Sequence, residues 1–101
     1  MRKKIHKKIQ LQATGAGTIY GYVEVEYSGP VGFMYQSSGA NVTGVLPIGS
    51  CDGVALGCVL TMAEGSLNAY QVGTVQQAPP FVGFAMESDG ADASLEGYVI
   101  Y

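Results

Sequence analysis

The chain has 101 residues and lacks positive charge over almost its whole length. No lysine or arginine occurs from Ile9 to Tyr101, whereas this stretch contains all eight acidic residues. A surface without these residues cannot neutralise phosphate groups, so we do not expect the body of the protein to bind nucleic acid. Charged residues make up 13% of the chain, against roughly 25% in an average soluble domain. We therefore expect partner subunits to cover much of the surface, because a small domain with few surface charges otherwise tends to aggregate.

Histidine and cysteine, which carry much of catalytic and metal chemistry, are nearly absent. The single histidine, His6, lies in a charged terminal segment, which excludes a packed Ser-His-Asp or Cys-His centre. Glu24 and Glu26 are two residues apart, and we interpret them as solvated residues of a strand face rather than a glycosidase pair. Cys51 and Cys58 need further ligands to bind zinc, and a disulfide between them is possible but not implied. We expect both to be small buried apolar residues that stay reduced, and we predict no enzymatic activity, no metal site and no cofactor.

Long hydrophobic runs are lacking too. The longest, residues 54–60, is interrupted by Gly57 and is far shorter than the roughly 20 residues of a membrane helix. The basic start of the chain continues into the alternating residues 9–14 instead of the apolar stretch of a secretory signal. The sequence therefore predicts a soluble protein, made inside a cell, without a membrane partner.

Apolar and polar residues alternate along most of the chain, which is the pattern of β-strands, and helical periodicity is almost absent. In the clearest segment, residues 18–27, Ile19 and Val23 share one face, and Tyr20 and Tyr22 share the other. The pattern predicts a single all-β domain over residues 9–101, a small sandwich or barrel of about seven or eight short, mostly antiparallel strands. The expected strands are 8–13, 18–27, 31–36, 42–48, 53–62, 67–76, 81–87 and 95–101. One helical turn is expected near residues 62–67.

The positive charge is gathered at the N-terminus, and we predict that residues 1–8 form a basic arm. Its charged side chains are Arg2, Lys3, Lys4, Lys7 and Lys8. The arm has three possible roles: contact with an acidic protein surface, including the acidic body of a neighbouring copy, a plain solvated tail, or contact with nucleic acid. Of these, nucleic acid is the least favoured.

Tyrosine is abundant, with seven residues in this short chain. Tyr20 and Tyr22 lie on the polar face of their expected strand, and Tyr98 and Tyr101 lie near the C-terminus. Tyrosine is favoured at protein interfaces because its ring packs while its hydroxyl stays hydrated. These four residues are therefore candidate interface residues. The alternative is that they pack against a neighbouring sheet of the same domain.

The half of the chain from Gly53 to Tyr101 resembles the C-terminal part of bacteriophage capsid decoration proteins, also called cement proteins. The resemblance is a pattern of glycines, strands and one proline corner rather than a chemical motif. It is carried by Gly57-Cys58-Val59-Leu60, residues 71–76, Ala78-Pro79-Pro80, residues 81–87, the acidic loop 88–94, and Gly97-Tyr98-Val99-Ile100.

The resemblance implies a structural virion protein on the outer surface of the phage head, made in the host cytoplasm. It implies a homotrimer that grips the major capsid protein with its N-terminal arm. The strand-like residues Ile9 and Leu11 that follow the arm would then add to a neighbouring sheet. Many weak contacts of this kind sum through multivalency. Two alternatives remain: another phage component, such as a tail, fibre or baseplate piece, or a small β-sheet module that binds sugar or nucleic acid. The binding module would need a tyrosine-lined groove on which polar side chains converge.

Overall fold

The computed structural model of the chain describes residues 4–26, 29–54, 58–59 and 70–101. This part of the chain contains eight β-strands and no helix. The strands are β1 (His6–Gln12), β2 (Ala16–Glu24), β3 (Val31–Ser38), β4 (Val42–Ser50), β5 (Cys58–Val59), β6 (Tyr70–Val75), β7 (Phe81–Asp89) and β8 (Ser94–Ile100).

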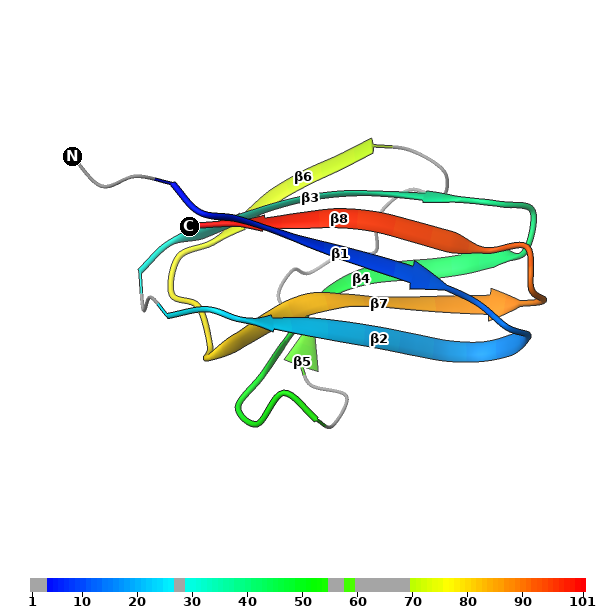
Figure 1. The fold of residues 1–101 in the computed structure, drawn as a ribbon, viewed down its shortest axis with the longest axis horizontal. Helices are drawn as coiled ribbons and strands as arrows, with labels where there is room; N and C mark the ends of the chain where they lie inside the picture. The colour runs from blue at the N-terminus through cyan, green and yellow to red at the C-terminus, as the bar shows by residue number, and fades with distance from the viewer. Residues whose placement is uncertain (1–3, 27–28, 55–57, 60–69) are drawn as a thin grey trace.

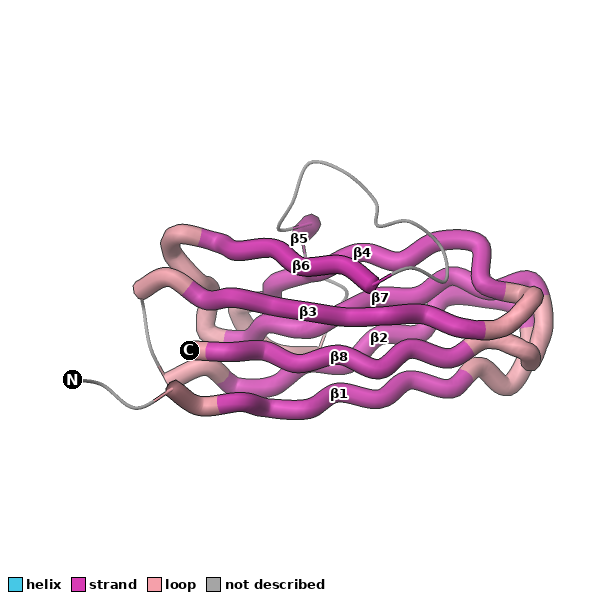
Figure 2. Tube along the Cα trace, turned by 90° about the horizontal axis from the view of Figure 1, so that it is seen from above, coloured by secondary structure: helices cyan, strands magenta, loops and turns pink. Residues whose placement is uncertain are grey.

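The strands form two four-stranded sheets that pack face to face (Figures 1 and 2). One sheet has the order β1-β8-β3-β6 and the other the order β2-β7-β4-β5, and every pairing is antiparallel. Successive strands thus alternate between the sheets for much of the chain, which is the strand order of a jelly roll. The prediction of an all-β fold is confirmed, and of the two expected architectures the structure has the sandwich.

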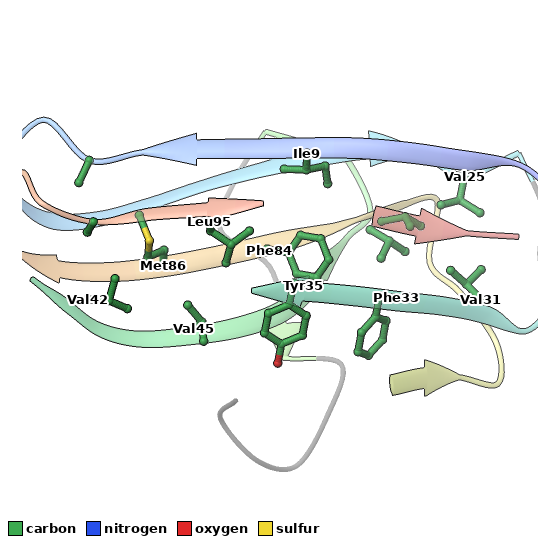
Figure 3. Packing of buried hydrophobic residues seen from close by; sticks show 14 of the residues in the cluster. Ile9, Val25, Val31, Phe33, Tyr35, Val42, Val45, Phe84, Met86 and Leu95 are labelled. Carbon is green, nitrogen blue, oxygen red and sulfur yellow. The ribbon is translucent and has the colours of Figure 1, made fainter. Parts of the chain in front are cut away.

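The core lies between the sheets and follows from the alternation of the sequence. In β3, Val31, Phe33 and Tyr35 are buried, while the residues between them are partly exposed. In β7, Phe84 and Met86 face them from the opposite sheet (Figure 3). Burial raises the pKa of the Tyr35 hydroxyl above its usual 10.0, because the charged phenolate would lose its hydration.

Three aromatic rings form the centre of this core. The Phe84 ring lies edge-on to Phe33, with centroids 6.4 Å apart, and its centroid is 5.0 Å from that of Tyr35. The space for Phe84 comes from Gly97 on β8: a β-carbon at position 97 would lie 2.5 Å from Cε2 of Phe84. A glycine therefore allows this ring to pack directly against the backbone of the other sheet.

The end of the sandwich away from the chain termini is fixed by hydrogen bonds between two loops (Figure 1). The backbone N–H of Asn41 donates to the carbonyl of Asp92 at 2.8 Å, and the Asn41 side chain bonds both Asp89 and the N–H of Asp92. Gly39 has a φ of 111°, a conformation that favours glycine, and any side chain there would collide with the Asp92 carbonyl. The two loops therefore hold the ends of β3, β4, β7 and β8 in place.

Three expectations about segments need correction. A strand was predicted over 53–62, but residues 53–54 are not in a strand, and the described strand of this segment is β5 (Cys58–Val59). The second strand was predicted at 18–27, but β2 runs from Ala16 to Glu24, because its pairing with β7 begins at Ala16 opposite Asp89 and ends at Glu24 opposite Phe81. Cys51 was predicted to be buried, and this is wrong: it follows the last residue of β4 and is exposed, with a free thiol. The expected helical turn at 62–67 lies outside the described residues.

Replacing Gly97 by alanine should destabilise the sandwich, because the new methyl group would overlap the fully buried Phe84 ring. We expect the free energy of unfolding to fall by about 1–3 kcal/mol, the usual cost of overpacking, in urea-induced unfolding. Gly15→Ala is the matched control, because a β-carbon at position 15 would meet no atom within 4 Å. Equal stability of the two variants would contradict this description of the core.

Candidate interaction surface

The sheet β1-β8-β3-β6 turns one side away from the core, and we call this side the outer face. The strand register places its side chains in rows that cross the strands. One row contains Gln10, Glu96, Gln36 and Tyr70, and the adjacent row contains Lys8, Tyr98, Met34 and Val72. Most of these side chains are exposed or half-buried, as expected for the alternate positions of strands with one buried face.

The outer face is hollowed. A hollow of about 630 Å³ is lined by residues of all four strands, among them Gln10, Gln36, Tyr70, Glu96 and Tyr98. Its rim is held by short contacts between neighbouring strands. The Tyr70 hydroxyl donates to the Met34 sulfur at 2.8 Å, and the hydroxyls of Ser38 and Ser94 are 2.8 Å apart. These contacts give the hollow a defined shape.

One border of the outer face is strand β6. It pairs with β3, and no strand in the described part of the chain pairs with its other side. Val72 is 71% exposed and Tyr70 is 58% exposed. An edge strand with free backbone N–H and C=O groups and exposed apolar side chains is a template for pairing with another chain. Neither charge nor proline protects this edge, because the sequence of β6 is YQVGTV.

The opposite border of the sheet contains the basic segment. Strand β1 begins at His6, so Lys7 and Lys8 lie within the sheet, opposite Val99 and Tyr98. Lys8 forms a surface ion pair with Glu96, with 3.3 Å between Nζ and Oε1. Lys4 is exposed, and Arg2 and Lys3 lie outside the described residues.

Lys7 does not point freely into solvent. Its Nζ donates to the backbone carbonyl of Glu24 at 2.7 Å and lies 5.5 Å from the centroid of the Tyr101 ring. A hydrogen bond with Tyr101 raises the pKa of Lys7 above its usual 10.5. Lys7 thus links β1 to the end of β2 in the other sheet.

Two further residues assigned to the arm face the interior. Ile9 is buried in the core, and Leu11 is half-buried and packs against the same core. In this conformation they are engaged within the chain and not presented to a partner.

The four candidate tyrosines have different surroundings. Tyr20 and Tyr22 pack edge-on on β2, with centroids 5.7 Å apart, and the Tyr20 hydroxyl donates to the Val54 carbonyl at 2.9 Å. Tyr98 lies half-buried in the hollow of the outer face. Tyr101 is 1% exposed, and its hydroxyl donates to the Glu24 carbonyl at 3.2 Å. Tyr101 therefore packs inside the domain, which is the alternative stated for these residues.

The sequence analysis did not single out Tyr70, Val72, Gln10 or Gln36. Alternation placed each of them in a strand, but whether these four side chains lie together on one face of a sheet depends on the order of the strands. Residues 6–12, 94–100, 31–38 and 70–75 become neighbours only in the folded sheet. The available signal was the pair of large apolar residues Tyr70 and Val72, at alternate positions of an expected strand without charged residues.

In the described part of the chain, no three or more histidine, cysteine, aspartate or glutamate residues are grouped so as to hold a metal ion. The described residues also contain no helix long and apolar enough to span a membrane.

Comparison with known proteins reveals a similarity of fold. No protein-family model and no curated protein sequence matches the chain. A solved structure of Bacillus endospore appendages, described as a novel family of disulfide-linked pili, superimposes with a TM-score of 0.58 at 12% sequence identity. The superposition covers 100% of this chain and 89% of the appendage chain. At this level of identity the similarity shows a shared fold and no more.

Replacing Lys7 by glutamine should lower the thermal unfolding midpoint at pH 7, because the contacts with Glu24 and Tyr101 are lost. Lys8→Gln is the matched control and should have a smaller effect, since an exposed ion pair contributes at most about 1 kcal/mol. The pKa of Lys7 is raised by folding, so its stabilising effect is present below pH 10.5 and is lost above it. The difference between wild type and Lys7→Gln should therefore shrink as the pH rises above 10.5. Equal midpoints for both variants at pH 7 would contradict the role given to Lys7.

Proposed function

We propose that this protein is a structural subunit that acts by assembling with other protein subunits, and that the β6 edge is its principal assembly surface. The observation that carries the proposal is the exposed edge strand, with Val72 71% exposed next to Tyr70. Soluble monomers usually protect such an edge with charge, proline or a covering segment. Strand β6 contains no charged residue and no proline.

Strand pairing across this edge would form main-chain hydrogen bonds with the partner and would bury Val72 and Tyr70. The small number of charged residues supports this proposal, because charges are depleted at the centres of protein interfaces. The fold is compatible with it as well: jelly rolls occur in viral capsid proteins, and the appendage structure of similar fold is described as forming pili.

Within this class, the sequence resemblance supports the finer proposal of a decoration protein on the outside of a phage head. In that form the partners are the major capsid protein and two further copies of the chain. The arm would be shorter than the sequence suggested. Lys7 and Lys8 are engaged by Glu24, Tyr101 and Glu96, and the backbone of Ile5 pairs with that of Tyr101, which leaves the residues before Ile5 for capsid contact.

The edge is tested with Val72→Lys, which adds a charge to β6 without touching the core, since Val72 is mostly solvent-exposed. We expect the wild-type chain to form oligomers in a concentration-dependent manner. The substitution should raise the dissociation constant of the oligomer at least about tenfold. Light scattering across a dilution series gives the mass, and addition to undecorated phage heads tests the finer proposal.

Thr14→Lys is the matched control, because it adds the same charge at an exposed position in the β1–β2 connection. It should assemble like the wild type. If wild type and Val72→Lys assemble equally well, or if neither the isolated chain nor its mixture with phage heads forms a complex, the proposal is wrong.

A further inference from the structure

We propose that the hollow of the outer face binds a neutral oligosaccharide. This site adjoins the assembly edge: Tyr70 borders both, whereas Val72 belongs to the edge and does not line the hollow. The inference combines a row of polar side chains, two tyrosines, a balanced charge and a suitable volume.

The polar row consists of Gln10 on β1, Glu96 on β8 and Gln36 on β3, which are direct neighbours in the strand register. Neither glutamine side chain forms a hydrogen bond within the described part of the chain. Each amide offers both a donor and an acceptor, and a sugar hydroxyl likewise both donates and accepts. Backbone groups between the strands are already used by the antiparallel ladders, so a ligand on this face must be recognised by side chains.

Tyrosine rings adjoin this row. Tyr98 is the neighbour of Met34 in the next row and lines the hollow, half-buried. Tyr70 borders it from β6, and its hydroxyl is held by the Met34 sulfur at 2.8 Å. A phenol ring offers an apolar surface beside a polar hydroxyl, which matches the alternating C–H and O–H groups of a pyranose. Small-molecule sites commonly combine such an apolar surface with a few polar groups that fix the orientation.

The charge of the hollow favours a neutral ligand. Among the described residues that line it, Glu96 is the one with a charge, and Lys8 lies 3.3 Å from its carboxylate. A phosphate or other strong anion would meet the carboxylate without an arginine fork to hold it. The volume of about 630 Å³ is within the range of roughly 300–1,000 Å³ that is typical of small-molecule sites. An oligosaccharide of two or three units suits a hollow of this size.

The probes are maltotriose, cellotriose and triacetylchitotriose, titrated into the full chain and followed by calorimetry. We expect at least one to bind with a dissociation constant in the millimolar range or tighter. Gln36→Ala, which alters an exposed side chain and leaves the core intact, should weaken binding at least about tenfold, as should Tyr98→Ala.

Gln77→Ala and Tyr20→Ala are the matched controls, because they remove the same groups from exposed positions outside the hollow. Neither should change the affinity. The proposal is overturned if none of the three sugars binds, or if the control variants weaken binding as much as the hollow variants. It is also overturned if an extended peptide displaces the bound sugar at a lower concentration than additional free sugar does. Light scattering on the same samples reports assembly separately, so failure of the assembly proposal is distinguished from failure of this one.

Discussion

The contact between Phe84 and Gly97 is the constraint on which the rest of the structure depends. The ring reaches from one sheet to the backbone of the other, and Phe33 and Tyr35 enclose it. Because the side chains of a strand alternate, fixing Gly97 on the inside also fixes Glu96 and Tyr98 on the outside. A shift of β8 by one residue would bring a carboxylate into the core. The packing of one aromatic ring thus determines which residues of β8 lie on the outer face.

The molecule that results has one side closed and one side open. At the closed side, β1 and β2 lie close together, and Lys7 connects them through the carbonyl of Glu24. At the open side, β6 has an exposed apolar edge, which is unusual for a monomer and suited to a subunit. The outer face between these borders has different chemistry, with amides and phenols around a hollow. An assembled subunit could therefore keep this face accessible while its edge is engaged.

Much of the fold could be predicted from the sequence because a strand has a period of two residues. Strands β1, β3, β4, β6, β7 and β8 lie where alternation placed them, and Val82, Phe84 and Met86 share a buried face as their spacing requires. Strand order could not be predicted, since pairs such as β3 with β8 join distant segments. The outer-face hollow depends on that order and was therefore missed, as were the contacts that engage Lys7 and bury Tyr101. The exposure of Cys51 could not be deduced either, because it depends on where β4 ends.

Hydrogen exchange of the β6 amides, compared between dilute and concentrated protein, tests the central claim most directly. An open edge that becomes paired on assembly should gain protection at alternate amides of Tyr70–Val75, with exchange slowed by about tenfold or more. The amides of β8, at the centre of its sheet, should be protected equally in both samples. Protection of β6 that is unchanged while the protein assembles, or that is already complete in the dilute monomer, would contradict the account.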